Sequence, residues 1–276
     1  MLFASLACGG GSAEQPEAGD AEQALAKEVE EDARRARRAG QKTETEQAPQ
    51  QIAGEGEVVF PDEIVEETVR KRLKQDEGPI LIADVEEFTE FSVALQLYVS
   101  NISGVERMVN LTDFDLTQNT TSDISALAGL TNLTRLDLAQ NDISDISALA
   151  GLTNLTYLRL KDNQVSDISP LSGMTELTEL DLWENQISDI SPLAGLTKLE
   201  ELNLTSNDIT DISPLSSLSN LRLLELTKNG ITDLSPLLEA GIGEGATIRL
   251  WNEPLDANSI EVVIPQLEAA GVKVQF

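Results

Sequence analysis

The sequence predicts an α/β solenoid, a right-handed arc with a parallel β-sheet on its concave face and short 3₁₀ or turn segments on its convex face. Residues 107–238 divide into six consecutive units of 22 residues, without insertion or deletion. Seven apolar columns recur through these units, and Thr121 alone interrupts them. A chain that is 41% hydrophobic does not produce such regularity by chance. A fixed period of this length is typical of solenoids, in which each unit completes its core only against its neighbours.

Unit 151–172 illustrates how one repeat is expected to fold. Leu158, Arg159 and Leu160 alternate apolar and polar side chains, which is the pattern of a half-buried strand. Strands of successive units then pair in parallel, about 4.8 Å apart. The rest of the unit is too short for an α-helical crossover, so the chain must return through a compact turn. Ser169 and Pro170 fit the N-cap and the first position of a 3₁₀ segment, because serine accepts a backbone N–H and proline lacks one.

The segment before the repeats is expected to form a helical N-terminal cap. Val65, Val69 and Leu73 recur every four residues, which predicts an amphipathic helix that ends at Gly78-Pro79. A second short helix is expected over Asp84–Phe91.

The segment after the repeats is expected to form a helix–strand cap. Residues 239–252 need an insertion of about two residues before Ile248 and Leu250 fall into register, as terminal units often do. The organisation that we expect is a signal-like segment over 1–8, a tether over 9–56, the N-terminal cap with a degenerate first repeat over 57–106, six repeats over 107–238 and the C-terminal cap over 239–276.

Two polar columns accompany the apolar ones. An asparagine follows the strand in every unit, and we expect its amide to satisfy backbone groups where the chain leaves the strand, as a structural ladder. A column of aspartates precedes the Ser-Pro or Ser-Ala turn and is expected to cap that turn rather than to hold a metal ion, since no calcium-loop spacing accompanies it. The asparagines are Asn119, Asn141, Asn163, Asn185, Asn207 and Asn229, and the aspartates are Asp123, Asp145, Asp167, Asp189, Asp211 and Asp233.

Three further columns should point outward from the strands. Their residues vary from unit to unit while the apolar columns do not, so we expect any binding specificity to lie in them. Tryptophan, tyrosine and arginine are the residues most often found as interface hot spots, and both tryptophans of the chain fall in the third column. The partner-binding residues that we expect are Arg135, Tyr157, Arg159, Lys161, Glu179, Asp181, Trp183, Glu201 and Trp251.

Composition limits the chemistry of the chain. A formal net charge of −29 and a pI near 4.1 repel nucleic acid, so no nucleic-acid partner is expected. The chain has no histidine and one cysteine, which excludes Ser-His-Asp and Cys-His catalysis and Cys/His zinc sites. We expect no enzyme activity, no cofactor and no metal. The nearest carboxylate pair for catalysis is Glu179 with Asp181, and ordinary solvated charges explain it.

The first residues resemble the end of a bacterial lipoprotein signal, in which small residues precede a cysteine that becomes lipidated. This resemblance implies a lipid anchor on Cys8, with residues 9–56 as the tether and the membrane contacted only through the lipid. It departs from the pattern because the charged segment is missing, the apolar stretch is short and Ser5 stands where leucine is usual.

The pattern Leu-x-x-Leu-x-Leu-x-x-Asn-x-Ile resembles the leucine-rich repeat, and the 22-residue period is similar to that of the internalin and phosphatase-regulator class. With the Phe60-Pro61-Asp62 helix and the segment Gly243–Phe276, the likeness to bacterial internalin-like proteins covers residues 58–276. It implies a monomeric binding module of the cell envelope whose partner is a protein. Two alternatives stay open: a polysaccharide-binding surface protein, and a cytoplasmic scaffold of the phosphatase-regulator type.

Overall fold

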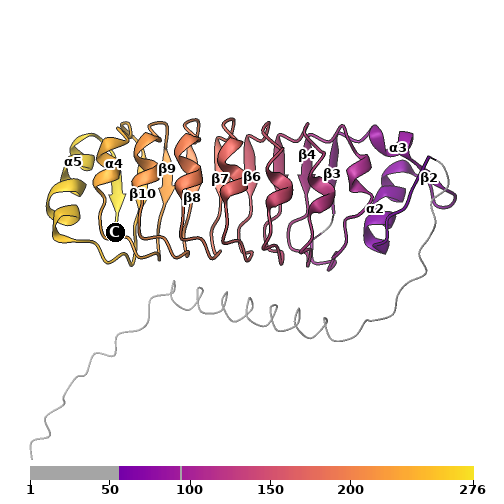
Figure 1. Cartoon of the computed structure of the whole chain (residues 1–276), viewed down its shortest axis with the longest axis horizontal. Coiled ribbons are helices and arrows are strands. Elements are labelled where there is room, and N and C mark those ends of the chain that lie inside the picture. The colour runs from indigo at the N-terminus through magenta and orange to yellow at the C-terminus, as the bar shows by residue number, and fades with distance from the viewer. Residues whose placement is uncertain (1–55, 94) are drawn as a thin grey trace, which may run out of the picture. The chain divides into compact units, whose positions relative to one another are not determined.

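The computed structural model describes residues 56–93 and 95–276. The predicted lipidation of Cys8 and the predicted tether lie outside the described residues. Nine short parallel strands form one sheet in which each strand pairs with its neighbours along the chain, in the order β11-β10-β9-β8-β7-β6-β5-β4-β3 (Figure 1). The strands are β3 (Glu90–Ser92), β4 (Asp113–Asp115), β5 (Arg135–Asp137), β6 (Tyr157–Arg159), β7 (Glu179–Asp181), β8 (Glu201–Asn203), β9 (Leu223–Glu225), β10 (Thr247–Arg249) and β11 (Lys273–Gln275).

The register of the sheet follows the 22-residue period. Leu158 at the centre of β6 pairs with Leu180 of β7, and the same alignment continues through Leu202 and Leu224 to Ile248. These central residues point into the core and are buried. Since all strands share one register, the outward-facing residues on either side of each centre form straight rows across the sheet. The α/β solenoid that the sequence predicts is therefore confirmed.

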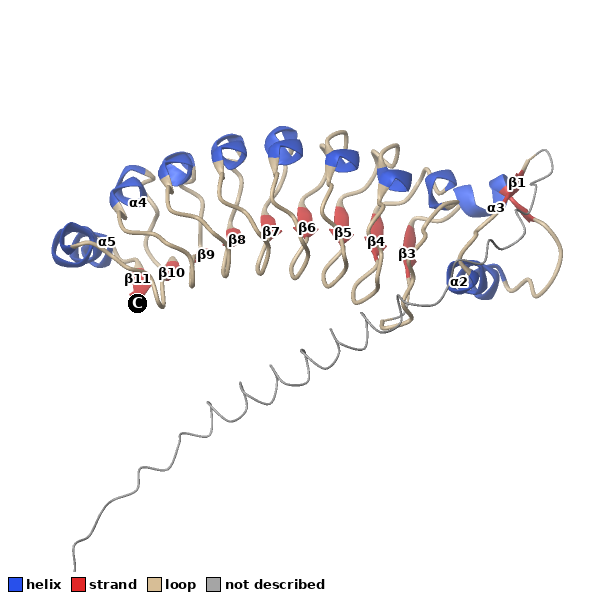
Figure 2. Cartoon of the chain, turned by 60° about the horizontal axis from the view of Figure 1, so that its bottom comes forward, coloured by secondary structure: helices blue, strands red, loops and turns tan. Residues whose placement is uncertain are grey.

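Short helical turns line the opposite side of the repeats from the strands, which lie on the inner side of the arc (Figure 2). Ser169 is the first residue of its 3₁₀ segment and Ile168 precedes it as the N-cap, so the predicted N-cap role of Ser169 is wrong by one residue. The carboxylate of Asp167, two residues before Ser169, instead accepts the backbone N–H of Ser169 at 2.8 Å. The turns are η1 (Val105–Arg107), η2 (Ser125–Leu127), η3 (Ser147–Leu149), η4 (Ser169–Gly173), η5 (Ser191–Gly195), η6 (Ser213–Ser217) and the α-helical α4 (Ser235–Glu239).

The N-terminal cap closes the core with a helix and a small hairpin. Helix α2 (Glu63–Leu73) begins after Asp62, whose carboxylate accepts the backbone N–H groups of Ile64 and Val65. The helix ends at Leu73, earlier than predicted, because Lys74 adopts a left-handed conformation. Strands β1 (Glu57–Val58) and β2 (Ile80–Leu81) pair antiparallel beside it.

The second predicted helix of this cap is partly wrong. Helix α3 spans Ile82–Glu86, and the chain then becomes extended, so that Phe91 lies in β3 opposite Phe114 of β4. Aromatic stacking explains the change, because the ring of Phe91 lies 6.1 Å from the rings of both Phe88 and Phe114.

The C-terminal cap covers the last repeat with η7 (Ser259–Val263), α5 (Ile264–Ala269) and strand β11. Val263, Ile264 and Leu267 are buried and belong to the same apolar core as the repeats. The expected helix–strand cap is therefore present. Across residues 56–93 and 95–276, no helix has both the length and the apolarity needed to span a bilayer.

Candidate functional site

The asparagine column links each repeat to the one before it. The amide nitrogen of Asn163 donates to the carbonyl oxygens of Leu160 in its own repeat and Leu138 in the previous one, at 3.0 Å each. Its carbonyl oxygen accepts the backbone N–H of Ile143 at 3.0 Å. Asn141, Asn185, Asn207 and Asn229 each make the corresponding bonds, and Asn119 accepts the N–H of Val99 and donates to the carbonyl oxygen of Leu116 in its own repeat. These side chains are committed to the framework.

A glutamate ends this column at the C-terminal cap. The two carboxylate oxygens of Glu253 accept the backbone N–H groups of Asn229 at 2.6 Å and Ile231 at 2.8 Å. The second bond is the one that the next asparagine would have made. Burial raises the pKa of Glu253, although the two N–H donors partly offset this effect.

The aspartate column caps the turns. In all six repeats the carboxylate accepts the N–H of the serine two residues later, at 2.8–2.9 Å. The backbone N–H of Ser191 holds the pKa of Asp189 below its usual value. The corresponding serine N–H groups lower the pKa values of Asp145 and Asp167 in the same way. Among the residues that the structure describes, no group of three or more acidic or cysteine side chains is arranged to hold a metal ion.

The outward-facing positions form three rows, which differ in how many of their side chains are buried or bonded to the rest of the chain. The first row begins each strand, the second ends it, and the third lies two residues beyond. In order across the sheet, the first row is Asp113, Arg135, Tyr157, Glu179, Glu201, Leu223 and Thr247, and the second is Asp115, Asp137, Arg159, Asp181, Asn203, Glu225 and Arg249. The third is Thr117, Ala139, Lys161, Trp183, Thr205, Thr227 and Trp251.

The second row is not free of structural duty, contrary to the sequence-based expectation. Asp181 and Asn203 each accept the backbone N–H of the residue two positions later, at 3.2 and 3.0 Å. Asp115 and Asp137 make the same bond, and the side chain of Asp137 is only 6% exposed. These residues therefore help to shape the turn that leaves the strand.

The third row is also less exposed than predicted. Ala139 and Thr227 are buried, and Trp183 is half-buried. The ammonium group of Lys161 lies over the ring of Trp183, 3.8 Å from its centroid, so these two predicted partner-binding residues contact each other. Trp251 is 46% exposed and lies near the end of the sheet, with the guanidinium of Arg249 6.0 Å from its ring.

Arginines neutralise carboxylates on much of the strand face. Arg159 lies between Asp137 and Asp181, at 3.2 and 3.5 Å, and Arg249 forms an ion pair with Glu225. Burial alone would lower the pKa of Arg159, but these carboxylates and Tyr157 outweigh it and raise the value, so the guanidinium stays charged. In the first row, Arg135 pairs with Asp113 at 3.6 Å. It also lies over the Tyr157 ring, 3.6 Å from the centroid.

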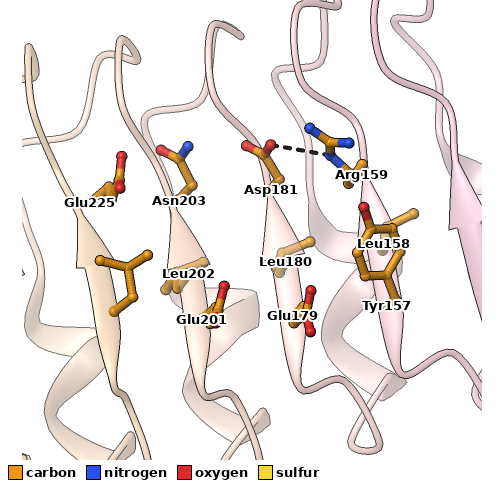
Figure 3. A pocket seen from close by; sticks show the side chains of 11 residues that line it. Tyr157, Leu158, Arg159, Glu179, Leu180, Asp181, Glu201, Leu202, Asn203 and Glu225 are labelled. Carbon is orange, nitrogen blue, oxygen red and sulfur yellow. Dashed lines mark ion pairs between the residues drawn. The ribbon is translucent and has the colours of Figure 1, made fainter. Parts of the chain in front are cut away.

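A shallow hollow of about 250 Å³ lies on the strand face over β6 to β9 (Figure 3). It brings together five of the predicted residues, namely Tyr157, Arg159, Glu179, Asp181 and Glu201. It does not include Lys161, Trp183, Arg135 or Trp251. The prediction missed three lining residues, Asn203, Leu223 and Glu225, although all three lie in the outward columns that the sequence identifies.

Comparisons with known proteins agree with this architecture. A family model described as leucine-rich repeats in two copies matches five overlapping segments, 109–151, 131–173, 153–195, 175–217 and 197–239. A comparison with curated protein sequences gives no match.

Solved structures give close matches. Internalin C2 from Listeria monocytogenes is 31% identical with a TM-score of 0.70, and the match covers 78% of this chain and 93% of that one. Internalin F from the same organism is 32% identical with a TM-score of 0.70, over 78% of this chain but only 63% of its own length. A leucine-rich-repeat protein from Leptospira interrogans shares the fold at 23% identity and a TM-score of 0.64, over 71% of this chain and 50% of that one.

The match to internalin C2 extends over nearly all of that chain. The shared repeat, the parallel strand face and the sequence identity lead to one assignment: the chain belongs to the internalin-like leucine-rich-repeat proteins.

Proposed function

We propose that the chain is a non-catalytic module that binds a protein partner through the strand face of its repeats. The observation that carries this proposal is the contrast between a framework that recurs in every repeat and a first row whose chemistry varies along the sheet. The first row passes from Arg135 through Tyr157 and two glutamates to Leu223. Fold stability does not require this variation.

The shape of the site supports binding rather than catalysis. The hollow is shallow and lies on one face of a sheet, whereas enzymes and small-molecule sites usually enclose their ligand. Its lining combines an aromatic ring, aliphatic surface and charged groups. This mixture is common at interfaces between proteins. Leucine-rich-repeat modules of the internalin-like class are typically interaction modules, which agrees with the proposal.

Site-specific photocrosslinking tests which face is used. A benzoylphenylalanine at Thr247, in the first row, should crosslink the full chain to a protein from cells or fluids that it meets. The matched control carries the same group at Ala194, which is exposed on the η5 turn on the other side. Equal capture from both positions, or capture only from Ala194, would show that the strand face is not the binding surface. A crosslinked product that is a polysaccharide would favour the alternative ligand.

We also propose that the module is held at the cell envelope by a lipid on Cys8. The support is the resemblance of residues 1–8 to a lipoprotein signal. Metabolic labelling with a palmitate analogue should mark the wild-type chain, expressed with its native start, and not a Cys8→Ser variant. Absence of label from the wild type would favour the cytoplasmic scaffold instead.

A further inference from the structure

One part of the first row carries negative charge that nothing else in the described chain neutralises. Glu179 of β7 and Glu201 of β8 are register partners and both are exposed. Figure 3 shows them side by side at the same level of neighbouring strands. Within residues 56–93 and 95–276, neither carboxylate has an ion pair or a hydrogen bond.

Most of the other carboxylates on the strand face are arranged differently. Asp113, Asp137, Asp181 and Glu225 all pair with an arginine of an adjacent strand. Strands lie about 4.8 Å apart, and like charges placed directly opposite each other are unfavourable. The framework gains nothing from retaining two glutamates here, since both point away from the core. A partner that supplies the missing positive charge would remove the repulsion.

The surroundings of the two glutamates indicate what kind of cation fits. Tyr157 precedes them in the first row and Leu223 follows them, so the carboxylates lie between an aromatic ring and an aliphatic side chain. All four residues line the same hollow, whose charged groups are four carboxylates and one guanidinium, that of Arg159. A side chain with an apolar stem and a positive end matches both the apolar residues at the two sides of this surface and its excess of carboxylates.

Arginine suits the pair of carboxylates better than lysine does. Its planar guanidinium presents several N–H donors in a fixed geometry, so one group can bond to two carboxylates at once, and its face stacks on aromatic rings. Within the chain, Arg135 already stacks on Tyr157, and Arg159 already lies between the carboxylates of Asp137 and Asp181. A pair of carboxylates is too small a set to enclose a metal ion, which agrees with the absence of metal-binding clusters among the described residues.

We propose that the hollow over β6 to β9 seats an arginine side chain of the protein partner, with its guanidinium between Glu179 and Glu201 and its stem against Leu223 and Tyr157. This inference rests on the proposed function, because it names the chemistry of the partner that the strand face binds. It predicts that the partner presents an exposed arginine, which electrostatic attraction to the acidic face would also help to orient.

The first test uses N-acetyl-arginine-methylamide as a probe for the full-length chain, followed by nuclear magnetic resonance. The probe should shift the carboxyl signals of Glu179 and Glu201 and the ring signals of Tyr157. A Glu179→Gln/Glu201→Gln variant should bind it about tenfold more weakly, since it loses charge-assisted hydrogen bonds. The matched control is Glu261→Gln/Glu268→Gln, which removes the same charge from exposed positions of the C-terminal cap and should bind the probe as the wild type does.

Four results would overturn the proposal. The citrulline analogue, which keeps the shape without the charge, could bind as well as the arginine probe. The lysine analogue could bind more tightly. Calcium ions alone could shift the same carboxyl signals and displace the probe. Equal weakening in the two double variants would show only the general attraction of a chain with net charge −29, and it would equally contradict a defined arginine site.

The second test separates this inference from the proposed function. The crosslinker at Thr247 is introduced into the Glu179→Gln/Glu201→Gln variant, and partner capture is measured. The arginine site predicts a loss of capture of about tenfold or more. If capture is unchanged, the strand face still binds a partner but the arginine inference fails. If the crosslinker at Thr247 captures nothing in the wild type either, the proposed function itself fails.

Discussion

The asparagine column and the first row of the strand face recur with the same period, but the asparagine side chains are bonded to the framework and the first-row side chains point to solvent. Asn163 is buried, and both groups of its amide are bonded to backbone atoms of its own and the previous repeat. Glu179, in the first row of the next repeat, is exposed and has no partner within the described chain. The residue type at position 163 is therefore constrained by the backbone groups around it, whereas the residue type at position 179 is not constrained by the fold and is available for binding.

The difference shows how a repeat protein separates stability from recognition. A framework position is repeated because every repeat presents the same unsatisfied backbone groups. A surface position varies because no backbone group depends on it. The predictions below test this division, starting with the change that should disturb the molecule most.

Asn163→Ala should destabilise the fold by about 1–3 kcal/mol, because it leaves the N–H of Ile143 without its acceptor. It also removes one of the two asparagine donors to the carbonyl oxygen of Leu160 and to that of Leu138. Urea unfolding followed by circular dichroism measures the loss. Binding of the arginine probe by the remaining folded protein should not change. If Asn163→Ala leaves stability intact while abolishing binding, the two roles have been assigned to the wrong positions.

Glu253→Gln should cost about 1–2 kcal/mol at neutral pH, because the amide oxygen can accept only one of the two N–H groups that the carboxylate bonds. Since burial raises the folded-state pKa of Glu253, the stabilising effect of its protonation is fully present below the unfolded pKa and is lost as pH rises through the folded value, so the wild type becomes less stable across this window while a glutamine does not titrate. The stability difference between wild type and Glu253→Gln should therefore vary with pH over that window. A difference that is constant from acid to neutral pH would contradict this assignment.

Trp183→Ala should cost less than about 1 kcal/mol, because the ring is half-buried and its contact with Lys161 is a single cation–π interaction. Its thermal midpoint should stay close to that of the wild type. Partner capture through the crosslinker at Thr247 should weaken if the third row takes part in the interface. Lys161→Ala is the matched control, since it removes the same internal contact and keeps the ring.

Asp189→Asn should have the smallest effect, and it should appear only as a change in pH dependence. The asparagine keeps an acceptor for the N–H of Ser191, so the turn survives. The pKa of Asp189 is lowered in the folded chain, so the aspartate's contribution is present above the unfolded pKa and is lost as pH falls through the folded value. Thermal unfolding at neutral and acid pH should show a slightly smaller acid loss for the variant. A larger loss would mean that the carboxylate does something other than cap the turn.

The fold could be predicted from the sequence because its determinants recur. Six copies of the same apolar spacing specify the strand, the turn and the register, and the asparagine column follows from the need to satisfy backbone groups. The caps were predicted less well, since they occur once. Phe91 was assigned to a helix because its own segment has helical spacing, and only its stacking against Phe114 in the next strand makes it part of the sheet.

The candidate site was harder to predict because its boundaries depend on backbone geometry. The residue before each asparagine, such as Gln140 or Glu184, has a positive φ of 54–58° although none of them is glycine. Just before this turn, the side chain of Asp181 accepts the backbone N–H of Trp183. The sequence shows an alternating strand but gives no sign of this turn, so it cannot distinguish the free first row from the partly committed second row.

Each asparagine bonds only to backbone groups of its own repeat and of the one before it. Every repeat therefore offers its neighbour the same set of hydrogen-bonding groups. Removal of residues 173–194 as a block would place Asn207 beside Asn163 and Glu201 beside Tyr157, and the strand pairing and the asparagine bonds would re-form between equivalent atoms. A lineage that loses, gains or exchanges whole repeats can therefore rearrange the sequence of side chains that a partner meets without having to rebuild the interior.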